Sequence, residues 1–219
     1  MRAVREVFAA AAAGYGKGNA LLALERPETE ALIGDVRGRR VLDLGAGTGH
    51  YAFWAMAHGA HNAVALDFAA EMLAGAPRPA VVADAARLPF RAGSFDLVVA
   101  ALVMSFVSDR AALLCEVARV LGRGGVLVLS DMHEVASELG WERSFRGPRG
   151  ERLVIDAPPP RRAAVQRALG EAGFALTDVR EPCIDDRLEP AFRRAGRRDF
   201  AAMRGLPVLQ LYRACRGGS

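Results

Sequence analysis

A glycine-rich segment flanked by an acidic residue carries the clearest chemistry in this 219-residue sequence. From Val41 to Gly49 it reads Val-Leu-Asp-Leu-Gly-Ala-Gly-Thr-Gly, so a short apolar run leads into three alternating glycines. Glycines let a backbone turn sharply and approach a ligand with no Cβ in the way, and a following helix offers free N–H groups at its N-terminus. The segment therefore predicts a strand, a ligand-binding turn and the start of a helix.

Acidic residues close the next two apolar runs. Asp67 follows the run 63–66 and lies 22 residues after Gly45, a spacing at which a carboxylate can accept from both hydroxyls of a ribose. Asp84 follows the run 80–83 in the same way. Because ligands of open α/β sheets bind at the carboxyl ends of the strands, we expect both side chains beside the glycine turn.

The glycine spacing separates one cofactor from another. A dinucleotide fingerprint would need a glycine at position 50, where His50 stands, and Asp43 precedes the turn. An acidic side chain that points into the turn suits a ligand with a positive group better than a pyrophosphate. The nucleoside S-adenosylmethionine has such a group in its α-amino end, and its carboxylate can use the helix N-terminus.

The elements around these residues alternate between strand and helix, which is typical of a parallel α/β sheet. We expect strands at 40–44, 63–66, 80–83, 95–101, 126–130, 174–179 and 207–214. Helices are expected at 48–57, with Phe53, Trp54, Met56 and Ala57 on its inner side, at 69–73, around Leu113, Leu114, Val117, Val120 and Leu121, and around Val165, Ala168, Leu169 and Ala172.

Five ordered segments resemble the class I S-adenosylmethionine-dependent methyltransferases, in particular the branch of the ubiquinone and menaquinone C-methyltransferases. They are 41–49, 65–73 (Ala-Leu-Asp-Phe-Ala-Ala-Glu-Met-Leu), 84–90 (Asp-Ala-Ala-Arg-Leu-Pro-Phe), 94–98 (Ser-Phe-Asp-Leu-Val) and 118–125 (Ala-Arg-Val-Leu-Gly-Arg-Gly-Gly). The resemblance implies a doubly wound, Rossmann-like α/β fold. Its seven-stranded sheet would be mostly parallel with the last strand antiparallel, and helices would cover both faces.

The same resemblance assigns the cofactor residues. Around the methionine end it places Asp43, Gly45, Ala46, Gly47 and Gly49, with Tyr15 as a lid. Around the ribose and adenine it places Asp67, Phe68, Met72, Asp84 and Ala85, with Ala101 at the end of the fourth strand. The alternative is structural, with Asp43 as a buried carboxylate, Asp84 as a turn cap and Phe68 as core.

The acceptor side is expected after the fourth and fifth strands. Leu102 to Phe106 would pass close to the sulfonium, and this stretch contains neither the proline-rich loop of nucleic acid base methyltransferases nor carboxylates for a metal. We therefore expect no metal and an apolar wall for a small organic acceptor. Residues assigned to the acceptor are Ser105, Phe106, Trp141, Arg143, Phe145 and Arg146, the last four of which could instead form a solvated hairpin that turns at 148–150.

His133, just past the fifth strand, is the candidate general base for an oxygen or carbon nucleophile, with nitrogen less favoured. Asp131 or Glu134 could orient its ring. The alternative is a histidine that caps or hydrogen-bonds locally.

The distribution of charge along the sequence limits which acceptors and which alternative functions are expected. Residues 1–140 carry 13 basic and 15 acidic residues, whereas 141–219 carry 16 and 10, so a net −2 is followed by a net +6. The basic part favours an anionic or acidic acceptor, or is only solvated surface. A tRNA or rRNA methyltransferase is an alternative function on the same grounds, although nucleic acid is disfavoured as a partner. A protein that binds the cofactor without catalysis is the further alternative.

The organisation expected is one domain, 1–219, with an N-terminal helical lid (1–35), a cofactor-binding core (36–131) and an acceptor-side part (132–219). Three cysteines without a C-x-x-C pair suit a reducing compartment, and no apolar run approaches the roughly 20 residues that cross a bilayer. We expect a cytoplasmic location without membrane contact; the sequence does not define an oligomeric state.

Overall fold

The fold is built on one seven-stranded sheet in a computed structural model that describes residues 2–16, 19–194 and 196–217. Its strands lie in the order β3-β2-β1-β4-β5-β9-β8. They span β1 Arg40–Leu44, β2 Asn62–Asp67, β3 Ala80–Val82, β4 Phe95–Ala101, β5 Leu121–Met132, β8 Phe174–Arg180 and β9 Leu209–Arg216. A separate hairpin pairs β6 Arg143–Arg146 with β7 Arg152–Ile155.

The strand directions confirm the expected topology. Strands β1 to β5 pair in parallel, whereas β9, the last strand in the chain, is antiparallel to both of its neighbours, β5 and β8. All parallel strands therefore end at one edge of the sheet. The loops that follow β1, β2, β3, β4 and β5 meet there.

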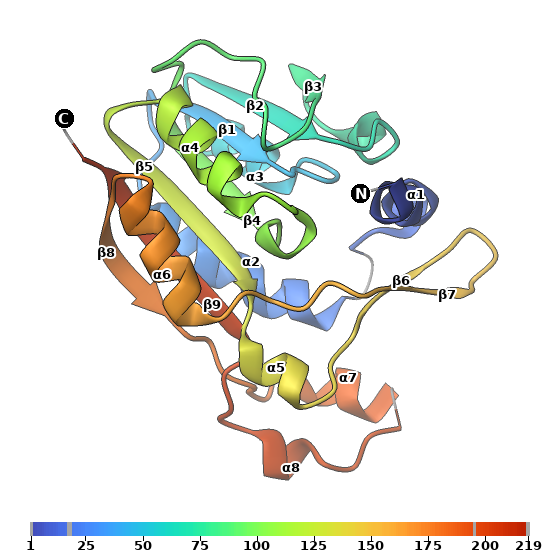
Figure 1. Cartoon of the computed structure of the whole chain (residues 1–219). Helices are drawn as coiled ribbons and strands as arrows, with labels where there is room; N and C mark the ends of the chain where they lie inside the picture. Colours follow the sequence, from blue (N-terminus) through green and yellow to red (C-terminus); the bar gives the residue numbers. More distant parts are fainter. Residues whose placement is uncertain (1, 17–18, 195, 218–219) are drawn as a thin grey trace.

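Helices cover both faces of this sheet (Figure 1). The α-helices are α1 Arg2–Ala11, α2 Ala20–Ile33, α3 His50–Ala57, α4 Arg110–Val120, α5 Glu134–Glu138, α6 Arg162–Glu171, α7 Glu189–Arg194 and α8 Phe200–Met203. Short 3-10 helices are η1 Ala12–Gly14, η2 Met72–Gly75 and η3 Met104–Phe106.

Two apolar cores result from the two-residue period of the strands. In β1, Val41 belongs to the core under α2 and α3, whereas Leu42 belongs to the core under α4 and α6. The same alternation holds in β4, where Leu97 and Val98 lie in different cores. Both faces are thus buried, which explains why these strands read as continuous apolar runs.

The N-terminal segment reaches over the carboxyl edge of the sheet. Asn19 caps α2 by accepting from the backbone N–H groups of Leu21 and Leu22, and α2 packs on β5 and β9. Helix α1 packs instead against the β6–β7 hairpin (Figure 1). Two segments far apart in sequence therefore close over the same edge.

Several expected elements differ from those observed. The helix expected at 48–57 begins at His50, and its buried residues are Tyr51, Ala52 and Ala55, whereas Phe53 and Met56 are 51% and 47% exposed. The inner face was therefore predicted wrongly for Phe53, Met56 and Ala57, whereas Trp54 packs against the core as predicted. The short helix expected at 69–73 is the 3-10 helix η2. Strand β5 begins at Leu121, directly after α4, and so is longer than the strand expected at 126–130 and includes Leu121, which the sequence predicted in the helix.

Candidate active site

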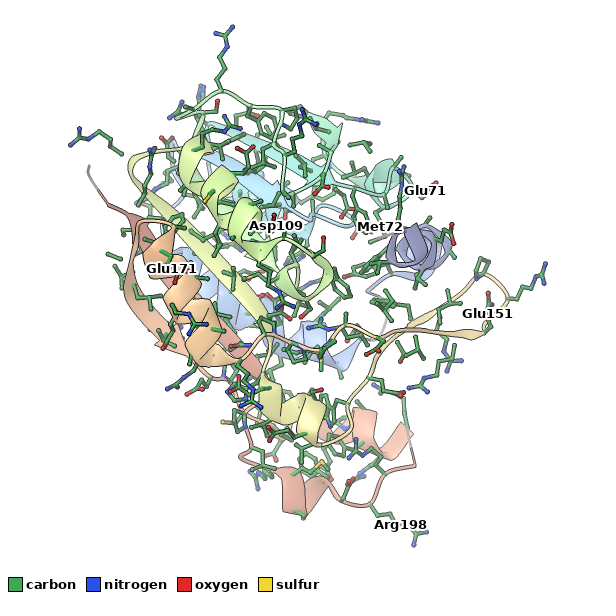
Figure 2. The ribbon with its side chains drawn as sticks, viewed as in Figure 1. Glu71, Met72, Asp109, Glu151, Glu171 and Arg198 are labelled. Atoms are coloured by element: carbon green, nitrogen blue, oxygen red, sulfur yellow. The ribbon has the colours of Figure 1, made fainter. Side chains whose placement is uncertain are left out.

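A cavity of about 540 Å³ lies at the carboxyl edge of the parallel strands. Its walls come from α1, the turn after β1, the ends of β2, β3 and β4, and η2. Met72 of η2 lies next to α1 (Figure 2), and its side chain shares an apolar cluster with Phe8 of that helix. Most of the predicted cofactor residues line this cavity: Tyr15, Gly45, Gly47, Asp67, Phe68, Met72, Asp84, Ala85 and Ala101.

Two glycines of the turn leave room that a side chain would fill. Gly45 and Gly47 have φ angles of 67° and 55°, in the left-handed region that favours glycine. A Cβ on Gly45 would approach Val103 Cγ2 to 2.4 Å, and one on Gly47 would lie 3.1 Å from Met72 Cε. The turn therefore needs glycine both for its backbone and for the width of the cavity.

The other two predicted turn residues have a different place. Gly49, the N-cap of α3, would bring a Cβ to 2.6 Å from Pro77 Cδ, so its missing side chain admits the loop before β3 rather than a ligand. Ala46 donates its N–H to Leu66 O and lines only a smaller cavity behind the turn. Neither borders the main cavity.

Asp67 lies at the end of β2, nearly buried but in the wall of the main cavity. Its Oδ2 accepts from Gly47 N at 2.9 Å and its Oδ1 from Ala69 N at 2.9 Å, and burial raises its pKa. Each carboxylate oxygen has a second lone pair for a ligand hydroxyl. Asp67 thus holds the glycine turn in shape and presents acceptors to the cavity.

Asp84 and Asp43 each accept a backbone hydrogen bond, as the structural alternative expects, and each also lines a cavity. Asp84 is exposed at the cavity and its Oδ1 accepts from Ala86 N at 2.9 Å, as in the turn-cap alternative. Asp43 lies behind the turn, where its Oδ2 accepts from Ala52 N of α3 at 2.9 Å. Burial raises the pKa of Asp43 to about 7. Asp43 lines the smaller cavity, of about 30 Å³, and not the main one.

A second cavity, of about 550 Å³, adjoins the first. Tyr15, Leu102 and Phe106 line both, so the two meet at the carboxyl end of β4. Five of the predicted acceptor residues line the second cavity: Phe106, Trp141, Arg143, Phe145 and Arg146. Its floor therefore comes from the β6–β7 hairpin, whose outer end is marked by Glu151 in Figure 2.

An aromatic cluster forms the boundary between the cavities. The Phe8 ring lies edge-on to Phe106 at 4.9 Å between centroids, and 5.0 Å from Phe145. Tyr15 stacks on Phe145 at 5.9 Å, and burial raises the pKa of Tyr15 to about 12, so its hydroxyl stays protonated at neutral pH. Tyr15 therefore lies between the hairpin and the glycine turn, and its role as a lid stays a prediction.

Ser105 and Arg143, two of the residues predicted to contact the methyl acceptor, belong to a buried hydrogen-bond network. Ser105 donates its hydroxyl to Asp131 Oδ1 at 2.8 Å and does not line either large cavity. Arg143 donates to the same carboxylate and to Ser105 Oγ, and its guanidinium lies 4.9 Å from the Phe106 ring centroid. These side chains hold the hairpin against the end of β5, beside the second cavity.

His133 occupies a helix cap outside the cavities. Its Nδ1 accepts from Val135 N at 3.2 Å in the first turn of α5, and its Nε2 lies 3.0 Å from Glu181 Oε1. Neither Asp131 nor Glu134 orients the ring as expected, because Asp131 serves the network above and Glu134 accepts from Arg162 N. The general-base role gains no support from this geometry, because the helix cap accounts for Nδ1 and the contact with Glu181 accounts for Nε2.

Several residues of the site were not singled out from the sequence. Phe8 and Arg5 enter the main cavity from α1, and Glu25 and Arg26 enter the small one from α2. Phe8 could have been identified from the sequence, because it is a large apolar residue in an alanine-rich segment. Leu102 was expected near the site but not its φ of 57°, which a leucine seldom adopts outside functional sites.

The described residues contain neither a metal-binding cluster nor a membrane-spanning helix. Within 2–16, 19–194 and 196–217, no group of three or more His, Cys, Asp or Glu side chains is placed to hold a metal ion. In the same part of the chain, every helix is too short or too polar to span a membrane. The sole lysine, Lys17, lies outside the described residues.

The glycine cradle and the acidic wall residues fit a nucleoside cofactor, and comparison with known proteins agrees. A family model described as a methyltransferase domain matches residues 42–129. A demethylmenaquinone methyltransferase of Mycobacterium sp. (strain KMS) is 43% identical over 136 residues, which cover 58% of this chain and 59% of that protein. Another, of Mycolicibacterium paratuberculosis, is 38% identical over 146 residues and 63% of each chain. The chain thus matches about three fifths of the length of these relatives.

Solved structures extend the likeness to most of the fold. An S-adenosylmethionine-dependent methyltransferase from Mesorhizobium loti is 28% identical, with a TM-score of 0.69 over 90% of this chain and 100% of the other. A Burkholderia thailandensis N1-methyltransferase of 1,6-didemethyltoxoflavin, solved with S-adenosylhomocysteine, has a TM-score of 0.66 at 16% identity over 99% and 88% of the chains. The latter likeness concerns the fold alone.

Fold, glycine cradle and strand-end carboxylates together are those of the class I S-adenosylmethionine-dependent methyltransferases, and residues 42–129 match a methyltransferase domain. Its cofactor is S-adenosylmethionine.

Proposed function

We propose that this protein transfers the methyl group of S-adenosylmethionine to a small organic acceptor held in the second cavity. The observation that supports this most is that the two cavities meet at Tyr15, Leu102 and Phe106. An in-line displacement needs the nucleophile, the methyl carbon and the sulfur in one row, so much of the catalysis is positioning. Two adjoining cavities with a shared wall provide that geometry.

When bound, the cofactor supplies a methyl group on a positively charged sulfur, and the acceptor's electron pair takes the methyl carbon as the carbon–sulfur pair returns to sulfur. The residues of the chain position the reactants. Gly45, Gly47 and Asp67 seat the nucleoside, while the aromatic cluster of Phe8, Tyr15 and Phe106 excludes water from the junction. The acceptor's proton leaves to solvent once the methyl group has been transferred.

The acceptor proposed is a flat aromatic molecule with an oxygen or carbon nucleophile, such as a hydroquinone. Phe106, Phe145 and Trp141 supply aromatic walls to the second cavity, and the curated relatives named above are demethylmenaquinone methyltransferases. Trp141 Nε1 is, in the described residues, a buried donor without a hydrogen-bond partner. Such walls favour a ring over an aliphatic acid.

The arginines of this cavity argue against a strongly anionic acceptor. Three of the four that line it are paired, since Arg143 contacts Asp131, Arg152 contacts Glu142 and Arg197 contacts Asp199. The fourth, Arg146, donates to Gly150 O. The residual positive charge is therefore small, and an acidic phenol or quinol fits it better than a polyanion such as RNA. The expected cytoplasmic location stays a prediction.

The test is product analysis with a deuterated methyl group on S-adenosylmethionine. The panel contains a naphthoquinol without a methyl group on its quinone ring, simple phenols, aromatic amines and unmodified tRNA. We expect the mass of the quinol or a phenol to rise by one deuterated methyl group. A Phe106→Ala variant should lose most of this product, while Phe53→Ala, on the exposed face of α3, should keep it. Methylated tRNA, or cofactor binding with no product from any acceptor, would contradict the proposal.

A further inference from the structure

The small cavity behind the glycine turn continues the main cavity. Tyr15, Gly45, Ala101 and Leu102 line both, whereas the residues after β3, such as Asp84, line only the main one. A nucleoside seated with its base toward Asp84 therefore has the small cavity at its other end. The tail of S-adenosylmethionine, an α-amino acid with one positive and one negative group, then points toward the small cavity.

A carboxylate of the chain already accepts hydrogen bonds from the N-terminus of α3, behind the glycine turn. Asp43 Oδ2 accepts from Ala52 N in the first turn of α3, and a backbone hydrogen bond from Tyr51 also favours the charged form of Asp43. These N–H groups were expected to receive the carboxylate of the cofactor. Since a buried carboxylate of the chain occupies them, the cofactor's own carboxylate needs a cation elsewhere.

Arg26 of α2 is placed to be that cation. Of the charged side chains around the small cavity, Glu25 accepts from three hydroxyls and His50 contacts Glu30 at 2.9 Å. Arg26 is half-buried, and its guanidinium makes no hydrogen bond or ion pair with any residue that the structure describes. A Cβ on Gly16 would lie 3.5 Å from Arg26 Nη2, which places the guanidinium beside the segment that leads to Tyr15.

We propose that Arg26 binds the carboxylate of the cofactor's amino-acid tail and so selects nucleosides that carry this tail. The inference rests on the proposed function, because it takes the main cavity as the seat of S-adenosylmethionine. A guanidinium can hold a carboxylate through two parallel hydrogen bonds, and such charge-assisted bonds are stronger than neutral ones. The lid residue Tyr15 and the selecting residue Arg26 then lie on one N-terminal segment.

The experiment compares two ligands that differ only in this tail. S-adenosylhomocysteine has the amino acid, whereas 5′-methylthioadenosine keeps the nucleoside and the thioether without it. Isothermal titration calorimetry should show that Arg26→Met weakens binding of S-adenosylhomocysteine about 10- to 100-fold, the range for a lost charge-assisted pair. Binding of 5′-methylthioadenosine should change less than about twofold, within ordinary surface-mutation effects.

Two further variants complete the design. Arg26→Lys keeps the charge but not the two-bond geometry and should fall between the wild type and Arg26→Met. Arg167→Met, a matched change of an exposed arginine on α6, should bind both ligands as the wild type does. Equal weakening of both ligands by Arg26→Met, or no weakening of S-adenosylhomocysteine, would overturn the inference. A wild-type protein that binds neither ligand would instead overturn the proposed function.

Discussion

Arg143 of the β6–β7 hairpin and Asp131 of β5 form an ion pair in which the two side chains are 7% and 0% exposed. Asp131 also accepts from the backbone N–H groups of Ser105 and Met132. The pair thus joins the hairpin, the end of β5 and the segment after β4. All three parts line the second cavity, together with residues of the N-terminal segment and of α7.

Breaking this pair should destabilise the protein strongly, because removing one partner leaves a buried charge without compensation. We expect Arg143→Met to lower the free energy of unfolding by about 3–5 kcal/mol in urea titrations. The double variant Asp131→Asn, Arg143→Met should lose less than the sum of the two single changes. Arg152→Met is the matched control, since its pair with Glu142 is exposed and worth about 1 kcal/mol or less. Equal losses for Arg143→Met and Arg152→Met would contradict the role of the buried pair.

Asp67 should matter for every nucleoside ligand, unlike Arg26. We expect Asp67→Ala to weaken S-adenosylhomocysteine and 5′-methylthioadenosine alike, about 10- to 100-fold, because both ligands carry the ribose whose hydroxyls it would accept. Calorimetry measures this directly, and the thermal stabilisation of the wild type, about 2.7 kcal/mol at 100 times the Kd, should fall with it. Glu171→Ala, on the exposed end of α6 (Figure 2), is the control. Unchanged affinity in Asp67→Ala would refute the assignment.

The free energy of unfolding should depend on pH because of the raised pKa of Asp43. Burial raises its pKa from 3.8 to about 7 in the folded protein. The folded state therefore binds the proton more tightly than the unfolded state, and its contribution to stability is fully present below about pH 4 and is lost as the pH rises to about 7. Urea titrations of the wild type and of Asp43→Asn across this range give the difference that isolates Asp43. The wild type should lose stability relative to Asp43→Asn as the pH rises; a constant difference would contradict the raised pKa.

The cofactor half of the site could be predicted from sequence because its parts are local. The glycine turn, Asp67 and Asp84 each follow a strand directly, and parallel strands bring their carboxyl ends to one edge whatever the rest of the chain does. The buried strands were equally clear as apolar runs. The buried face of α3 could not be predicted in the same way, because Ala52 and Ala55 pack closely on the sheet while the larger Phe53 and Met56 face outward. Side-chain size alone indicated the opposite face.

The acceptor half depends on contacts between distant residues, which spacing does not reveal. The partners of His133 include Glu181, 48 positions away, and those of Arg143 include Ser105, 38 positions away. The arginine-rich region 141–219 looked like a receptor for anions, yet three of the four arginines at the second cavity are paired with carboxylates. A count of charges along the sequence contains no information about this pairing.

His133 offers the clearest separation between a helix cap and a general base. We expect His133→Ala to lower the free energy of unfolding by about 1 kcal/mol, the typical value of a lost N-cap, with kcat within about twofold of the wild type. The geometric reason is that its ring contacts Val135 N and Glu181 and lies outside both large cavities. His133→Asn, which can cap a helix but is not a base, should restore the stability. A loss of turnover in both variants, with binding of S-adenosylhomocysteine unchanged, would reverse this conclusion and assign His133 to the chemistry.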